Sequence, residues 1–148
     1  MQAIIFSGLQ ASGKTTFYLQ HFFHTHLRIN LDQLRTRHRE NLFLQCCLFT
    51  QLRFVVDNTN PTKAERQKYI LLAREARYEV ICYYFETAAQ DAISRNKNRT
   101  GKQFVPERGI YATLHKFEKP SFDEGFDKIY TVRIRQSGEF EIEEWQQE

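Results

Sequence analysis

Long apolar runs, paired cysteines and a basic leader segment are all missing from this sequence of 148 residues. No apolar run approaches the roughly 20 residues that a helix needs to span a bilayer. The chain opens on Met1–Ile5 without the basic stretch and cleavage site of a secretory signal. The three cysteines are odd in number and lack metal-ligand spacing, which suits a reducing compartment. We therefore expect a cytoplasmic protein with no membrane partner.

Glycine and proline are also scarce, with six and three residues, and neither occurs between Gly13 and Pro61. No repeat, low-complexity tract or linker interrupts the sequence. A hydrophobic content of 41% with 14% aromatic residues is typical of a globular protein and excludes a disordered one. The length is typical of one domain with a substantial core. The sequence thus predicts a single domain over residues 1–148.

The most informative stretch is Gly8–Thr15, which matches the phosphate-loop pattern G-x-x-x-x-G-K-[ST]. Ala3–Phe6 before it has the length of a buried strand, and Thr15–Gln20 after it can begin a helix. Glycines allow backbone conformations that a Cβ penalises, so consecutive N–H groups can turn toward an anion. Lys14 supplies charge to the β- and γ-phosphates, and the Thr15 hydroxyl is a ligand for Mg²⁺. The pattern predicts that ATP and Mg²⁺ bind at Gly8, Gln10, Ala11, Ser12, Gly13, Lys14, Thr15 and Thr16.

A second candidate pair, Asp32 and Arg35, follows a short strand expected near residues 26–30. Asp32 has an ordinary role available as the cap of a helix, and Arg35 lies one helical turn later. In a parallel α/β sheet, however, ligands bind beyond the carboxyl ends of the strands. We favour a site in which Asp32 orients and deprotonates a hydroxyl while Arg35 holds a neighbouring phosphate. A cap with a surface ion pair is the alternative.

A third candidate, Asp57, ends the apolar strand predicted at Phe54–Val56. This arrangement is the Walker-B pattern, in which a carboxylate holds Mg²⁺ directly or through a water. The polar turn that follows places Thr59 and Asn60 where they can bind substrate. Ordinary turn chemistry also explains it, since Asn-Pro marks turns.

The remaining elements follow from periodicity and capping signals. A helix over 41–51 is expected, with Leu42, Cys46 and Phe49 on one apolar stripe and Phe43, Cys47 and Thr50 beside it. Thr62 with Glu65, and Thr87 with Gln90, have the spacing of capping boxes and predict two further helix starts. The other expected elements are a strand over 78–85, a helix over 106–116, a strand over 129–134 and a terminal strand near 140–145.

Residues 95–106 form a basic stretch with a glycine and few apolar side chains. Such a segment resembles a lid that closes over phosphates, excludes water and brings arginine into the site. Arg95 and Arg99 are one helical turn apart, so either or both can do this, and we expect Arg95 to bind the nucleotide. A solvated loop is the alternative.

Charge is distributed unevenly, although the formal net charge is only +3. Residues 28–39 and 91–108 each have a local charge of +3, whereas after Arg135 only acidic charges occur. Two basic segments and an acidic tail suit a polyanion site away from the C-terminus. Charge runs are more often solvated faces, so both interpretations of this pattern stay open.

Four segments together resemble the 5′-kinase domain of polynucleotide kinases: the phosphate loop, Ile29–Arg35, Asp57–Pro61, and Arg95–Arg99 with Pro106. The resemblance covers residues 1–118. It implies that Asp32 is the general base on a 5′-hydroxyl and that Arg35 holds the adjacent phosphate. It also implies that Asp57 and the turn after it line the acceptor and metal side, and that Arg99 is a lid arginine that stabilises the transferring phosphoryl group.

We therefore expect a P-loop NTPase fold, three-layer α/β/α, with a mainly parallel sheet and a C-terminal strand addition. The expected activity is transfer of the γ-phosphate of ATP to a hydroxyl, with the 5′-end of a nucleic acid as favoured acceptor. The Asp-x-Asp-Gly-Thr run of a phosphatase half does not occur in the sequence. A small-molecule kinase is the alternative enzyme, and an NTP-dependent switch is the alternative outside enzymes. The oligomeric state is not indicated.

Overall fold

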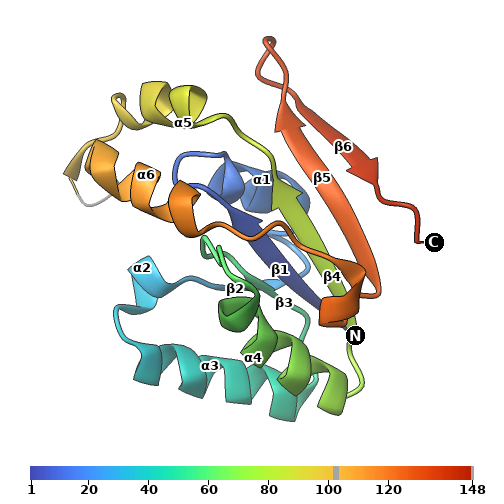
Figure 1. Cartoon of the computed structure of the whole chain (residues 1–148). Helices are drawn as coiled ribbons and strands as arrows, with labels where there is room; N and C mark the ends of the chain where they lie inside the picture. Colours follow the sequence, from blue (N-terminus) through green and yellow to red (C-terminus); the bar gives the residue numbers. More distant parts are fainter. Residues whose placement is uncertain (102–103, 148) are drawn as a thin grey trace.

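A computed structural model describes residues 1–101 and 104–147 of the chain (Figure 1). Its centre is a sheet in the order β2-β3-β1-β4-β5-β6. All neighbouring strands pair in parallel except β5 and β6, which form an antiparallel hairpin at one edge. The mainly parallel sheet and the C-terminal strand addition are therefore confirmed. The strands are β1 (Gln2–Gly8), β2 (Leu27–Ile29), β3 (Phe54–Val56), β4 (Glu79–Phe85), β5 (Lys128–Ile134) and β6 (Phe140–Glu144).

Helices cover both faces of this sheet, as the three-layer prediction requires. In Figure 1, α3 and α4 lie on one side, α1 lies behind the sheet, and α5 and α6 lie together beside the loop after β1. No helix among the described residues has both the length and the apolar character needed to cross a membrane. The helices are α1 (Lys14–His21), α2 (Leu31–Leu34), α3 (Arg37–Thr50), α4 (Lys63–Glu75), α5 (Ala89–Asn96) and α6 (Glu107–Lys116).

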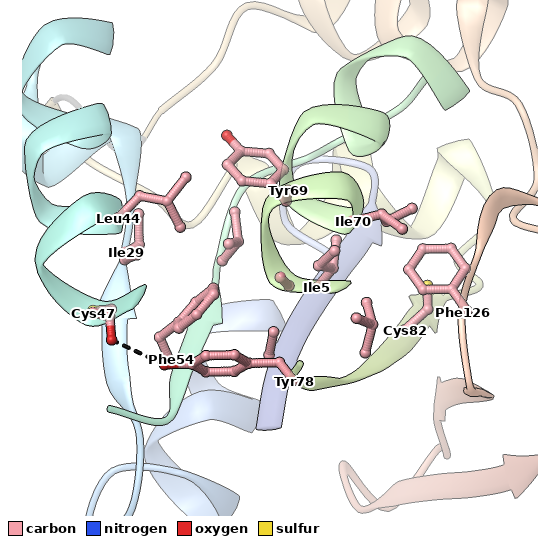
Figure 2. Close-up of a cluster of buried hydrophobic side chains, with 14 of the residues drawn as sticks. Ile5, Ile29, Leu44, Cys47, Phe54, Tyr69, Ile70, Tyr78, Cys82 and Phe126 are labelled. Carbon is pink, nitrogen blue, oxygen red and sulfur yellow. Dashed lines mark hydrogen bonds between the residues drawn. The ribbon is translucent and has the colours of Figure 1, made fainter. Parts of the chain in front are cut away.

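The alternation of side chains along the strands divides the core in two. On β1, Ala3 and Ile5 join the cluster under α3 and α4, whereas Ile4 and Phe6 join the cluster under α1. Figure 2 shows the first cluster, in which Tyr78 donates a hydrogen bond of 2.9 Å to the carbonyl oxygen of Cys47. Burial on both faces explains why β1 is an almost continuous apolar run.

The face predicted for the second long helix is wrong. Helix α3 begins at Arg37, four residues earlier than expected, and leaves Leu42, Cys46 and Phe49 in solvent. Phe49 is 91% exposed. The helix is rotated relative to the prediction because it buries the carboxylate of Glu40. Residues at helical spacing from Glu40 lie on the same face and are therefore buried too. The buried residues of α3 are Glu40, Leu44, Cys47 and Leu48.

The two predicted capping boxes have different outcomes. The box of Thr62 and Glu65 at the start of α4 is present, with both hydrogen bonds made. The cap predicted at Thr87 is wrong, because α5 begins at Ala89 after an Ala88 that makes no side-chain cap. The N–H of Glu86 still bonds to the carbonyl oxygen of Val132 at 3.0 Å. The chain is thus extended beside β5 up to this point, and the helix starts later than its first polar residue.

Candidate active site

The phosphate loop connects β1 to α1 at the carboxyl edge of the sheet, and its two glycines have different roles. Gly13 has a φ of 93° and is the residue before α1, so it uses the left-handed region that favours glycine. Gly8 ends β1, where a Cβ would lie 2.7 Å from the Cβ of Phe85. Glycine is therefore needed at position 8 because the backbone packs closely against β4. At position 13 it is needed because of the left-handed backbone conformation.

Lys14, the first residue of α1, folds back over the loop. Its Nζ donates to the carbonyl oxygens of Gly8 at 3.2 Å and Leu9 at 2.7 Å, and to the Ser12 hydroxyl at 3.3 Å. The pKa of Lys14 is lowered to about 8; burial is the largest cause and Arg99 also lowers the pKa, whereas Asp57 and Asp32 oppose the change. The predicted phosphate lysine, base and lid arginine therefore interact electrostatically.

Thr15 and Asp57, the two predicted metal ligands, are in contact. The Thr15 hydroxyl donates to Oδ2 of Asp57 at 3.3 Å. The same carboxylate oxygen accepts 2.8 Å from Nε of Arg28, whose Nη2 donates to Oγ1 of Thr15 at 3.1 Å. One alcohol and one carboxylate oxygen are the hard ligands that Mg²⁺ takes in such sites, where phosphates and waters complete the coordination. The residues present fit this ion.

The segment with Asp32 is organised by Asn30, not by Asp32 itself. The Asn30 side chain is the N-cap of α2 and accepts 3.0 Å from the N–H of Gln33. The cap role considered for Asp32 is therefore wrong, and Asp32 is an exposed residue of the first turn. Arg35 lies just past the end of the four-residue helix with a φ of 79°, so it does not continue the helical turn from Asp32. Both residues are exposed, Asp32 in the first turn of α2 and Arg35 just past its end.

Asn58 holds this segment from the other side. Its Oδ1 accepts 2.9 Å from the N–H of Leu31, and its Nδ2 donates 3.0 Å to Oε2 of Glu40. Burial raises the pKa of the Glu40 carboxyl, but hydrogen bonds from Tyr69, Lys68, Asn58 and Arg37 outweigh it and lower that pKa. A buried, ionised carboxylate thus anchors both the turn after β3 and the start of α2.

The turn after β3 is fastened to β1 by buried hydrogen bonds. Asn60 is 4% exposed, and its Nδ2 donates 2.8 Å to the carbonyl oxygen of Phe6. The carbonyl oxygen of Asn60 accepts from Ser7 Oγ at 2.8 Å and from Arg66 Nη1 at 2.9 Å. The carbonyl oxygen of Thr59 accepts 2.9 Å from the N–H of Gly8. These contacts fix the turn against the start of the phosphate loop.

The predicted lid begins inside α5, which ends at Asn96, and Lys102 and Gln103 lie outside the described residues. The two ends of the segment are joined because Asn96 pairs with both backbone groups of Val105. Arg95 and Arg99 are both half-buried. Burial lowers the pKa of Arg99, and the nearby Asp32 opposes that change.

Two buried side-chain atoms in the described part of the chain have no hydrogen-bond partner, and both belong to predicted nucleotide-binding residues. They are Nη1 of Arg95 and Oε1 of Gln10. Such atoms are rare in folded proteins because each costs desolvation free energy. A buried guanidinium nitrogen without a partner fits an anionic ligand, and Ala92 and Ile93 of the same helix pack with Leu9 of the phosphate loop. Of the other predicted loop residues, Ala11 and Ser12 are buried and Thr16 is exposed on α1.

Three residues of the site were absent from the sequence prediction: Arg28, Asn30 and Asn58. Asn directly before a helix is a known capping signal, so Asn30 was recognisable. Asn58 lies in the turn that the pattern had selected, but its partners come from two distant segments. Nothing in the sequence distinguishes Arg28 from other surface arginines.

Comparison with known proteins is consistent with this geometry. A protein-family model described as an AAA domain matches residues 4–120. The bifunctional polynucleotide phosphatase/kinase of Schizosaccharomyces pombe is 25% identical over 138 residues, which cover 90% of this chain and 34% of that protein. The chain therefore spans about a third of the length of the curated relative that it matches.

Solved structures extend the likeness at the level of the fold. Kti12 of Chaetomium thermophilum, in complex with ADP-AlF3, has a TM-score of 0.68 at 14% identity, covering 92% of each chain. A gluconokinase from Sinorhizobium meliloti 1021 has a TM-score of 0.65 at 18% identity, covering 91% of this chain and 83% of that one. The predicted P-loop fold is thereby confirmed.

Proposed function

Because the chain belongs to the AAA-domain family, whose model matches residues 4–120, we propose that it is an ATP- and Mg²⁺-dependent kinase acting on a hydroxyl. The favoured acceptor is the 5′-hydroxyl of a nucleic acid. One observation carries the proposal: Thr15, the residue after Lys14 in the phosphate loop, donates to Oδ2 of Asp57 at 3.3 Å, and Asp32 and Arg99 affect the pKa of Lys14. These residues come from four segments that only the fold brings together.

These residues divide the work of phosphoryl transfer, which is mainly positioning and charge stabilisation. Lys14 neutralises the β- and γ-phosphates, and Thr15 and Asp57 hold Mg²⁺, which withdraws charge from the phosphate oxygens when bound. Asp32, exposed at the start of α2, accepts the proton of the attacking hydroxyl. Arg99 faces the same region from the lid segment and stabilises the transferring phosphoryl group.

The acceptor assignment has its own support. The similar Schizosaccharomyces pombe protein is named a polynucleotide phosphatase/kinase. Arg35 is exposed three residues beyond Asp32, where it can hold a phosphate next to the reacting hydroxyl. Thr59 and Asn60 lie in the turn between this segment and the phosphate loop, and we propose that the turn lines the acceptor side. The side-chain amide of Asn60 is engaged by Phe6, so its part in the site is to shape the turn.

The decisive experiment is transfer of labelled γ-phosphate from ATP to a 5′-hydroxyl oligonucleotide by wild type and Asp32→Asn. We expect transfer by wild type and a loss of about 10²- to 10⁴-fold in the variant, the range of general-base catalysis. ATP binding should persist in the variant because Asp32 does not hold the nucleotide. Equal transfer by both proteins would exclude Asp32 as the base.

A small-molecule kinase is the second candidate, since the fold is shared with a gluconokinase. The two acceptors differ in salt dependence. Binding of a polynucleotide should weaken steeply as salt rises because its counterions are released, whereas a small neutral acceptor should show little slope. An NTP-dependent switch, the third candidate, would hydrolyse ATP slowly and need neither Asp32 nor an acceptor.

A further inference from the structure

Arg28 is the central residue of the edge strand β2, and its guanidinium reaches across to the ends of two other elements. It is 2.8 Å from Oδ2 of Asp57 at the end of β3 and 3.1 Å from Oγ1 of Thr15 in α1. The Tyr18 ring lies beside it, 5.9 Å from the guanidinium carbon. The Asp57 side chain is 2% exposed and that of Arg28 is 24% exposed. The ion pair with Asp57 is thus largely removed from solvent, whereas the contact with Thr15 is exposed.

The two oxygens that Arg28 contacts are those assigned to the metal. Mg²⁺ demands oxygen ligands in a near-octahedral arrangement at about 2.0–2.1 Å, or a bridging water in their place. A guanidinium that donates to Oδ2 of Asp57 and Oγ1 of Thr15 uses the lone pairs that the ion or its water would take. A cation already beside these oxygens also repels a second one. Arg28 and Mg²⁺ therefore exclude each other at this position.

We propose that Arg28 is an internal competitor of Mg²⁺: it holds Thr15 and Asp57 in the nucleotide-free protein and is displaced when Mg–nucleotide binds. Arg28 then sets how strongly Mg²⁺ promotes nucleotide binding. The alternative role is structural, with Arg28 only neutralising a buried carboxylate in every state of the protein. The inference rests on the proposed metal role of Thr15 and Asp57.

The test compares how much Mg²⁺ strengthens nucleotide binding with and without the guanidinium. For each protein, the Kd of a fluorescent ATP analogue is measured in EDTA and in saturating Mg²⁺, and the first value is divided by the second. We expect this ratio to rise about tenfold in Arg28→Gln, equivalent to about 1.4 kcal/mol of lost competition. Arg28→Lys keeps the charge with a different geometry, so its Kd ratio should lie between those of the wild type and Arg28→Gln.

Arg133→Gln is the matched control. Arg133, in β5, is also a strand arginine paired with carboxylates, at 3.2 Å from Glu86 and 3.2 Å from Glu143, but neither of these carboxylates is assigned to the metal. Its loss removes the same charge, and the ratio should stay at the wild-type value. A ratio in Arg28→Gln that equals or falls below the wild-type value would overturn the inference.

A second measurement follows Arg28 in the wild-type protein and does not depend on any variant folding. The ¹⁵N resonance of its Nε–H should shift on addition of Mg²⁺ with a non-hydrolysable ATP analogue, and should not shift with the analogue in EDTA. A resonance that is unchanged by Mg–nucleotide would also overturn the inference. If phosphate transfer failed while the Kd ratio and the resonance shift behaved as expected, only the proposed reaction would be wrong. If no nucleotide bound, both the proposed function and the inference about Arg28 would be wrong.

Discussion

The side-chain amide of Asn30 donates a hydrogen bond of 2.6 Å to the main-chain carbonyl oxygen of Asp57. The carbonyl end of the same side chain accepts the N–H of Gln33. One buried asparagine therefore joins the end of β2 to the end of β3 and starts the helix that presents Asp32. The separation of the proposed base from the proposed metal ligand depends on this residue.

Asn30→Ala should reduce phosphate transfer more than it reduces stability. Loss of the cap is worth about 1 kcal/mol of unfolding free energy, whereas misplacement of a reacting group by about 1 Å can cost 10²-fold in rate. We expect kcat to fall about 100-fold with nucleotide affinity nearly unchanged. Steady-state kinetics and urea denaturation measure the two effects.

The control is Thr36→Ala, which removes the side-chain cap of α3, a 3.1 Å bond to the N–H of Arg39. It should cost similar stability and leave kcat close to wild type. If both variants lost transfer equally, helix capping alone would explain the effect and the positioning role of Asn30 would be rejected.

Nucleotide affinity should decline as the pH rises above 8. The pKa of Lys14 is lowered from 10.5 to about 8, chiefly by burial, so the ammonium group is present below pH 8 and lost above it in the free protein. A bound phosphate favours the charged form, so binding near pH 8 should be accompanied by proton uptake. Calorimetry in buffers of different ionisation enthalpy measures that proton directly. In Lys14→Arg, which keeps its charge, both effects should vanish; a wild-type Kd that stays constant well above pH 8 would contradict the assignment.

Arg99→Gln should abolish most of the transfer while the protein still binds ATP. Arginines that stabilise a transferring phosphoryl group contribute about 10³-fold or more to kcat. Lys97→Gln is the matched control, because Lys97 lies in the same segment and is exposed. A solvated loop would instead give the two variants similar, small effects. Single-turnover transfer with labelled ATP distinguishes these outcomes.

The buried ion pair of Arg66 and Glu124 should be essential for stability. Nε of Arg66 lies 2.8 Å from Oε1 of Glu124, and their side chains are 0% and 3% exposed. Removing one partner leaves an uncompensated buried charge, so Glu124→Gln should cost about 3 kcal/mol or more of unfolding free energy. The exposed pair of Arg133 and Glu86 should be worth about 1 kcal/mol or less. Equal losses in Glu124→Gln and Arg133→Gln would contradict this difference.

Sequence patterns correctly predicted the features that depend on residues close together in the chain. The phosphate loop, the apolar strand ending in Asp57 and the capping box at Thr62 each depend on neighbours within a few residues, and the structure contains all three. The C-terminal strand was also readable from its alternation of apolar and acidic residues.

The sequence predictions failed where contacts with distant parts of the chain determine which residues are buried or enter the site. The sequence predicted an apolar stripe of Leu42, Cys46 and Phe49 on α3, yet the structure buries the face that contains Glu40. The hydrogen bonds that make this possible come from Tyr69 and Lys68 in α4 and from Asn58 in a turn. The role of Arg28 was likewise not predicted, because its partners lie just after β3 and in α1. Such residues can be identified only once the fold has brought their partners to them.

The C-terminal hairpin reaches the phosphate loop from the side of the sheet opposite α3 and α4. A Cβ at Gly13 would lie 3.0 Å from Ile134 Cδ1 and 3.1 Å from the Phe140 ring, which also packs edge-on against Phe17 of α1 at 5.1 Å. The last two strands thus pack against the phosphate loop, even though they provide none of the proposed catalytic groups. Shortening the protein at the end of its kinase-like motifs would remove this packing, so truncated forms made for crystallisation or fusion should retain the hairpin.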